Sequence, residues 1–292
     1  EALLRLAHRH LMVFDLEKAM QIAEAAAAES QIVADVWLSQ TVRAELAGIK
    51  HVACEWNDAI AIYEDALASA IGLGDVLTQT ALHISIGTAQ HNLGNTEPAR
   101  HHLRTGIRLA QRNEFALFEL KAQLQLGRLE TQLKAWNDAE THLDAAASLV
   151  EALGTPDALA HLPLVQVGQA QLELAMGRPV EALQTARQAV AEAVAQEKQI
   201  DLAVCLRVEA EALMAQARFD EAASLLEEAL GHLAGRNPYE IAKTQALLGR
   251  ALSVDSDGDM DRLTLGRRLM ADATIAFTRL GAKLDLAALA MQ

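Results

Sequence analysis

Four aspartates alternate with other residues in the segment 254–261, and carboxylates at this spacing are a candidate calcium site. A calcium-binding loop of this kind needs glycine at its sixth position and a bidentate glutamate at its twelfth. Counted from Asp255, those positions hold Met260 and Gly266. We therefore interpret the segment as a solvated acidic turn.

Histidines are the second candidate for metal binding. His101 is adjacent to His102, and His8 lies two residues before His10. Neighbouring residues of a helix point about 100° apart, so His101 and His102 cannot easily share one ion. Neither pair has a carboxylate or thiol at a ligand spacing. The sequence predicts no metal site and no cofactor.

Motifs for catalysis are missing from the sequence. It holds no phosphate loop of the form GxxxxGKS/T, no HExxH, no GxSxG and no CxxC. Each of these patterns would place a nucleophile, a phosphate cradle or a metal ligand at a defined point of the backbone. We expect the chain not to be an enzyme.

Charge and composition limit the partners and the compartment. The formal net charge of −14 disfavours nucleic acid and anionic membrane as partners. No apolar run approaches the roughly 18 residues needed to span a bilayer. We interpret Cys54 and Cys205 as reduced thiols, typical of a cytoplasmic protein. Because Glu1 lies inside a helical pattern, we expect the chain to be a segment of a longer protein.

The elements that would position a site follow from an internal repeat. Six alanines recur 40, 40, 40, 43 and 40 residues apart: Ala19, Ala59, Ala99, Ala139, Ala182 and Ala222. A small residue also stands seven positions after each anchor, and in most units another stands twelve before it. Small residues let two antiparallel helices approach closely. A fixed period in this range indicates stacked helical hairpins.

The pattern predicts seven hairpins and their turns. In the fifth, Gly168 stands two residues from the expected place, which predicts an insertion near 176–179. Asn and Asp at the turns, among them Asn57, Asn137 and Asp220, are expected to cap the second helices. The expected repeats are 1–30, 31–74, 75–112, 113–155, 156–197, 198–236 and 237–282, together forming one solenoid over 1–292.

Two stretches carry a family resemblance. Ile86-Gly87 with Ala99 and Gly106, and Leu126-Gly127 with Ala139 and Ala146, resemble the tetratricopeptide repeat (TPR). The period of about 40 exceeds the usual 34 and is similar to that of the sensor region of bacterial signal-transduction ATPases with numerous domains (STAND), of the maltose-activator type. The resemblance implies an all-α, right-handed superhelix and a nucleotide-binding domain outside this chain.

In such superhelices the first helix of each hairpin lines a concave face. The places that correspond to this face hold polar residues: His51, Thr88, His91, Asn92, Lys121, Arg128, Thr131, Gln132, Gln169, Glu173, Arg207 and Glu211. Basic residues gather there although the chain is acidic. We therefore expect a polar or anionic ligand, either a protein or peptide partner or a small effector. The alternative is a merely solvated face.

The sequence leaves the function open between two classes. The first is the sensor or regulatory arm of a multidomain bacterial signalling ATPase or transcriptional regulator. The second is a constitutive protein-interaction scaffold that senses nothing. Exposed apolar ends of the array would also allow self-association.

Overall fold

Helices account for the regular structure of the described residues, and none of those residues lies in a strand. The computed structural model describes residues 2–12, 16–33, 36–234, 236–254 and 259–290, without the side chains of residues 4, 8, 11–12, 31–33 and 36–40. The chain falls into two compact units, Glu1–Phe118 and Glu119–Gln292.

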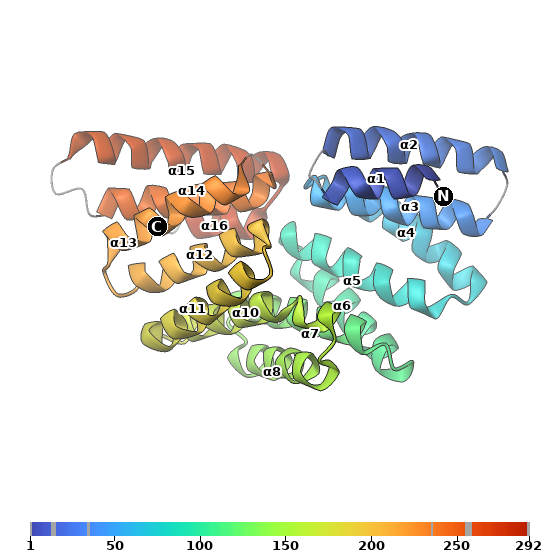
Figure 1. The fold of residues 1–292 in the computed structure, drawn as a ribbon, viewed down its shortest axis with the longest axis horizontal. Helices are drawn as coiled ribbons and strands as arrows, with labels where there is room; N and C mark the ends of the chain where they lie inside the picture. Colours follow the sequence, from blue (N-terminus) through green and yellow to red (C-terminus); the bar gives the residue numbers. More distant parts are fainter. Residues whose placement is uncertain (1, 13–15, 34–35, 235, 255–258, 291–292) are drawn as a thin grey trace. The chain divides into compact units, whose positions relative to one another are not determined.

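Unit 1 consists of consecutive helices that pack as antiparallel neighbours (Figure 1). Their bounds are α1 (Ala2–Met12), α2 (Leu16–Val33), α3 (Val36–Val52), α4 (Trp56–Leu73), α5 (Val76–Asn92) and α6 (Thr96–Arg112). The expected boundary near residue 30 lies a few residues too early, because α2 continues to Val33. Helix α7 (Ala116–Gln132) contains the division between the units.

Unit 2 repeats the same arrangement. Its further helices are α8 (Trp136–Leu153), α9 (Pro156–Leu159), α10 (Leu162–Ala175), α11 (Pro179–Ala195), α12 (Gln199–Met214), α13 (Phe219–Leu233), α14 (Pro238–Val254), α15 (Met260–Leu280) and α16 (Lys283–Ala290). Helices α10, α12 and α14 also contact one another in that order, so the first helices of successive hairpins lie side by side. This is the TPR-like, all-α hairpin architecture that the sequence predicts.

Small residues explain how closely the paired helices approach. All six anchor alanines have 0% of their surface exposed. A β-carbon added at Gly87 would lie 2.7 Å from Cγ of Leu103, and one added at Gly127 would lie 2.7 Å from Cγ of Leu143. Real β-carbons do not tolerate such contacts, so these glycines fix the separation of α5 from α6 and of α7 from α8.

The turn inside five hairpins has one backbone form. A residue in the left-handed region ends the first helix, and these residues recur at the spacing of the anchors: Cys54, Gly94, Lys134, Gly177 and Ala217. The amide of the following residue then donates to the carbonyl five positions back, as from Asn95 to Gln90 at 2.8 Å. This is the Schellman closure of a helix C-terminus.

The expected Asn and Asp caps are wrong for these turns. The N-cap residues of α4, α6, α8, α11 and α13 accept no side-chain hydrogen bond from the helix start. After the Schellman closure the next helix begins within two residues. In α8, for example, the aromatic residue Trp136 is the first residue of the helix. Side-chain caps occur between hairpins instead, where Asp75 accepts from Thr78 N at 3.1 Å and Thr155 from Ala158 N at 3.3 Å.

The extra residues of the fifth hairpin lie before its first helix. The short helix α9 occupies the connection between α8 and α10. Ala170, twelve residues before Ala182, is fully buried and holds the small-residue place. A β-carbon at Gly168 would instead meet Leu143, which belongs to the preceding hairpin. The predicted displacement of Gly168 and the insertion at 176–179 are therefore wrong.

The acidic segment lies partly outside the described residues, which exclude 255–258. Of its aspartates, Asp259 has a structural role: its Oδ1 accepts from the amides of Asp261 and Arg262 at 2.9 and 3.1 Å. It is therefore the N-cap of α15. Among the described helices, none is both long enough and apolar enough to cross a bilayer.

Candidate functional site

Helices of the last hairpins surround a cavity of about 410 Å³ in unit 2. Its walls come from α10, α12, α14, α15 and α16. Residues four apart on a helix share a face, which places Arg207 with Glu211 on α12 and Lys243 with Leu247 on α14. The apolar part of the lining consists of Leu174, Met214, Ala215, Ala246, Leu247, Phe277, Ala288 and Leu289. The polar part consists of Arg207, Glu211, Lys243, Arg250 and Asp285.

Arg207 is the most buried charged group at the cavity, with 1% of its surface exposed. Its Nη2 donates to Glu240 Oε2 at 2.8 Å, and its Nη1 donates to Glu211 Oε1 at 3.1 Å. Burial alone would lower the pKa of Arg207, but Glu240 and Glu211 outweigh this, and the net pKa is raised. The guanidinium is therefore held charged by two carboxylates.

Glu240 stands at the centre of several positive charges. Burial alone would raise its pKa, but Lys243, Arg207 and Arg128 outweigh this and lower the pKa to about 2. Conversely, burial lowers the pKa of Arg128 and of Lys243, and Glu240 opposes this in both. One carboxylate thus balances part of the charge of three cations, because charge interactions are strong where water is excluded.

The remaining cavity groups have a different arrangement. The Tyr239 hydroxyl donates to Asp285 Oδ2 at 2.9 Å, which joins α14 to α16. The Lys243 ammonium lies 5.0 Å from the centre of the Tyr239 ring. Among the described residues, no carboxylate lies within ion-pair distance of Lys243 or of the exposed Arg250. These two cations face the cavity with donors to spare.

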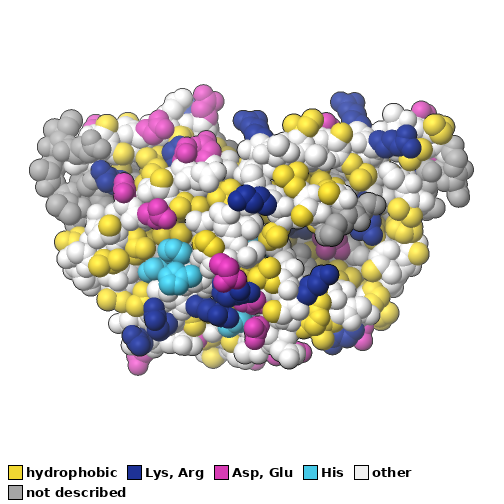
Figure 2. Space-filling view, turned by 180° about the vertical axis from the view of Figure 1, so that it is seen from behind, with side chains coloured by type: hydrophobic (Ala, Val, Ile, Leu, Met, Phe, Trp, Pro, Cys, Tyr) yellow, Lys and Arg dark blue, Asp and Glu magenta, His cyan; other side chains and the backbone are white. Residues whose placement is uncertain are grey.

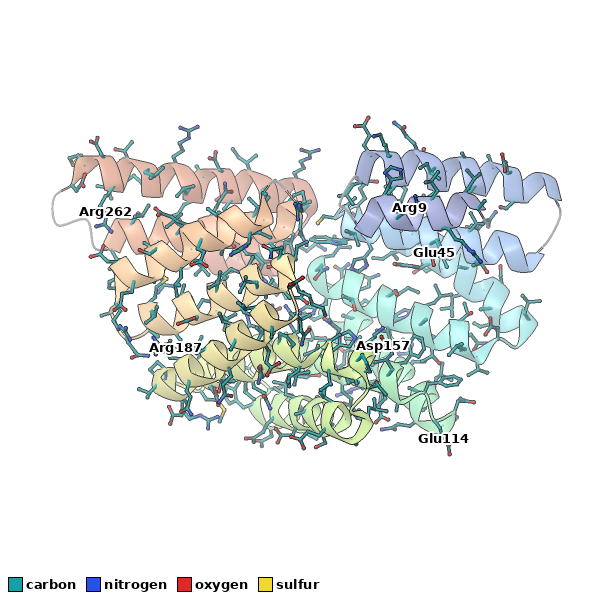
Figure 3. The ribbon with its side chains drawn as sticks, viewed as in Figure 1. Arg9, Glu45, Glu114, Asp157, Arg187 and Arg262 are labelled. Carbon is teal, nitrogen blue, oxygen red and sulfur yellow. The ribbon has the colours of Figure 1, made fainter. Side chains whose placement is uncertain are left out.

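Ion pairs outside the cavity link its wall helices to their neighbours. Arg187 on α11, labelled in Figure 3, donates from Nε to Glu209 on α12 at 2.9 Å. Arg262 at the start of α15, also labelled there, donates to Asp220 on α13 at 2.7 Å. Exposed pairs of this kind each contribute about 0–1 kcal/mol, so packing rather than charge sets the helix positions.

The structure brings some of the sequence-predicted residues of unit 2 together. Arg207 and Glu211 line the cavity. The positive charges of Arg128 and Arg207 both help to lower the pKa of Glu240. Thr131 donates to the Gly127 carbonyl at 2.9 Å. Gln132 is exposed at the end of α7.

Lys121 and two other predicted residues lie elsewhere in unit 2. The pKa of His161 is lowered to about 4, mainly by burial, and the positive charge of Lys121 lowers it further. Gln169 and Glu173 line a second cavity of about 360 Å³, between α10 and the second helices α8 and α11. Their prediction depends on the two-residue shift that the structure contradicts. Without the shift, Gln171 takes the place of Gln169 in the repeat.

The predicted residues of unit 1 do not line the cavity found there among α3, α4 and α5. That cavity has a volume of about 660 Å³, with Glu45 and Tyr63 in its wall. His51 packs on Tyr63 with ring centres 6.4 Å apart, and burial lowers its pKa to about 4. Thr88 donates to the Ile84 carbonyl at 2.9 Å. His91 is 7% exposed, and Asn92 is half-buried.

Sequence reasoning missed Lys243 and Arg250 for an identifiable reason. The seventh repeat has no anchor alanine, so the series of anchors ends at Ala222. Its small residue is Gly249, which packs on α15 as the earlier glycines pack on their partners. Counted from Gly249, Lys243 stands at the repeat position that Lys121 has in its own repeat. Arg250 stands at the repeat position of Arg128 and Glu211. The signal was present in the period.

Comparison with known proteins supports the fold. No family model matches the sequence, and no curated protein matches it. Among solved structures, the apo form of RapI has a TM-score of 0.70 at 12% identity, covering 95% of this chain and 97% of that one. NprR in complex with its cognate peptide NprX has a TM-score of 0.65 at 14% identity, covering 91% and 76%.

A third match carries the repeat in its name. A tetratricopeptide repeat protein from Parabacteroides merdae has a TM-score of 0.53 at 17% identity, covering 100% of this chain and 98% of that one. Identities this low establish a common architecture and no common activity. The fold and its hairpin packing define this chain as a TPR-like helical-repeat protein.

Proposed function

We propose that the chain is a ligand-binding regulatory module whose cavity in unit 2 receives a short peptide or a small effector with an anionic group. The observation that carries this is the pairing of an apolar wall with two cations, Lys243 and Arg250, that have no carboxylate at ion-pair distance among the described residues. Pockets that bind small ligands combine a mostly apolar lining with a few polar groups.

The charge arrangement distinguishes a structural role from a binding role. Arg207 already donates to Glu211 and Glu240, so a ligand carboxylate would have to displace one of them. Lys243 is half-buried, its ammonium faces an aromatic ring, and its neighbour at the cavity is the exposed Arg250. An incoming anion would therefore contact Lys243 and Arg250, while its apolar part would lie against Met214 and Leu247.

The similar structures support a peptide as the ligand. One of them, NprR, is a complex with its cognate peptide, and another is a Rap protein complexed with competence and sporulation factor. The resemblance to long-period TPR regions adds a context, in which this module is the sensor arm of a STAND-type signalling ATPase. Ligand binding would then favour one arrangement of the hairpins over another and change the state of the attached domain.

A scaffold without effector sensing is the alternative function. Helical repeats contact only their neighbours and offer long surfaces for protein partners. The two functions differ in what a small ligand does. An effector of the sensor stabilises the free chain by mass action, whereas a scaffold is stabilised only by its protein partner.

Binding to a library of peptides of five to eight residues with free C-termini tests the proposal. Thermal-shift screening of the whole chain, followed by calorimetry, should find peptides that bind the wild type. Each charge-assisted hydrogen bond contributes about 1.5–3 kcal/mol, so Lys243→Gln and Arg250→Gln should each weaken binding by about 10- to 100-fold. Arg267→Gln, on the exposed surface of α15, is the matched control and should bind as the wild type does.

Two results would reject this assignment. One is unchanged affinity in both cavity variants, which would place the ligand elsewhere. The other is a library without any binder while a folded protein partner binds tightly, which would favour the scaffold.

A further inference from the structure

Two histidines from facing helices meet at the surface of unit 1. His83 lies on α5 and His102 on α6, and their Nδ1 atoms are 3.0 Å apart. The ring centres are separated by 5.1 Å, with a tilt of 40° between the planes. Figure 2 shows a compact group of histidine side chains on one face, with basic side chains nearby.

Both imidazoles are neutral near pH 7. Burial lowers the pKa of His83 to about 4, and the nearby charges of His102, His101 and Arg108 act in the same direction. Burial, followed by His101, also lowers the pKa of His102. One Nδ1 of the pair therefore carries a proton and donates to the lone pair of the other. Neutral imidazole is the form that binds metal ions.

We propose that His83 and His102 together bind a divalent transition-metal ion that prefers square-planar or octahedral coordination, the class of Cu²⁺ and Ni²⁺. Nitrogen ligands lie about 2.0–2.1 Å from such an ion, and two nitrogens 3.0 Å apart then subtend an angle of about 90° at the metal. That angle fits neighbouring positions of a tetragonal site, whereas a tetrahedral ion prefers a wider one.

Metal binding requires only a proton shift within the pair. The ion takes the lone pairs of both Nδ1 atoms, and the proton between them moves through water to Nε2 of the ring that held it. No net proton is released. Among the described residues, no set of three or more His, Cys, Asp or Glu side chains is arranged around one point. Water therefore completes the coordination, and the exposed Arg108 reduces the affinity to some extent.

His101 serves as a built-in control. It neighbours His102 on α6, but its ring meets that of His102 edge to face, with centres 5.5 Å apart, and it is exposed. Adjacent residues on a helix diverge, so His101 does not complete the site. Replacing it leaves both proposed ligands in place.

The repeat supplies a matched pair that holds only one histidine. Forty residues further on, Gln123 and His142 occupy the places of His83 and His102, and Gln123 Oε1 lies 2.7 Å from His142 Nδ1. His83→Gln therefore recreates a helix-to-helix hydrogen bond that this fold already contains. The reverse change, Gln123→His, would create a second histidine pair.

Titration of the whole chain with Cu²⁺ at pH 7.5, followed by calorimetry and electron paramagnetic resonance, tests the site. The wild type should bind one tight equivalent, with hyperfine coupling to two nitrogens. Losing even an outer-shell partner costs about 10- to 100-fold in metal affinity, so His83→Gln should bind this equivalent at least tenfold more weakly. His101→Gln should bind it unchanged, and Gln123→His should bind a second equivalent.

Three outcomes would overturn the inference. They are no tight equivalent in the wild type, equal affinity in His83→Gln, or loss of the site in His101→Gln. Circular dichroism of each variant separates loss of binding from loss of fold, and the gain in Gln123→His cannot arise from unfolding.

Discussion

The contact between α14 and α15 predicts opposite effects for two glycine-to-alanine changes in the same unit. A β-carbon at Gly249 would lie 2.6 Å from the Gly266 carbonyl oxygen and 3.1 Å from the Met270 amide nitrogen. Both are backbone atoms, so no side-chain rotation relieves the clash and one helix must move. A β-carbon at Gly231, within α13, would meet nothing within 4 Å.

The magnitudes follow from two opposing effects. Alanine is favoured over glycine inside a helix by about 1 kcal/mol, whereas overpacking a close contact costs about 1–3 kcal/mol. Gly231→Ala has the first effect only, and it should stabilise by up to about 1 kcal/mol. Gly249→Ala has both, so it should be less stable than Gly231→Ala by roughly the steric cost, about 1–3 kcal/mol.

Hydrogen exchange of the α14 and α15 amides, with urea unfolding of the whole chain, provides the measurement. Exchange reports local opening, which matters because long repeat arrays need not unfold in one step. Protection in α14 and α15 should fall in Gly249→Ala and stay unchanged or rise in Gly231→Ala. If Gly249→Ala were as stable as Gly231→Ala, the backbone contact between these helices would not exist as described.

Two further predictions concern buried titratable groups. The pKa of Glu240 is about 2 in the folded chain, against an ordinary 4.5. The ionised carboxylate therefore stabilises the folded state by about 3 kcal/mol. This contribution is complete above pH 4.5 and is lost as the pH falls through 2. The stability difference between wild type and Glu240→Gln should therefore shrink between pH 5 and pH 2 in urea titrations, and a constant difference would contradict the assignment. Cys54 and Cys205 are buried, and burial raises the pKa of Cys205 to about 12. A thiol reagent should therefore label neither cysteine in the native chain and both in guanidinium. Rapid labelling of Cys205 in the native chain would contradict its burial.

The sequence alone was sufficient for the hairpin architecture, because close helix packing constrains residue size at fixed places. Ala99, Ala139 and Ala222 are fully buried, and a larger side chain would overpack the contact between the helices, so the period stays visible in this sequence alone. The turns could not be predicted as well. Their closure uses backbone hydrogen bonds and a left-handed residue, and Lys134 or Ala217 at that place carries no signal that distinguishes it from other surface residues.

The site was predicted less completely than the fold. The offset of a residue from its anchor alanine predicts which face of its helix the residue lies on, but it does not identify the side chains of other helices that lie beside it. The predicted two-residue shift in the fifth hairpin selected Gln169 and Glu173, which lie on another face of α10, because the extra residues lie before that helix and not within the hairpin. The partner of His102 is His83, nineteen residues earlier on a facing helix, while the sequence suggested only its neighbour His101. A pairing across two helices becomes visible only when their separation and rotation are known.

The same reasoning changes which basic residues could recognise an anion. The sequence concentrates attention on Arg128 and Arg207, yet both lie beside Glu240, and Arg207 already donates to two carboxylates. Removing one partner of a buried pair is costly, so Arg207 acts as a positioning residue that orders α12 against α14. Lys243 also acts on the charge of Glu240, but neither Lys243 nor Arg250 has a carboxylate at ion-pair distance among the described residues. An acidic chain can thus offer a local cationic surface, because Glu211 and Glu240 form their ion pairs with Arg207 and, among the described residues, leave the donors of Lys243 and Arg250 for a ligand.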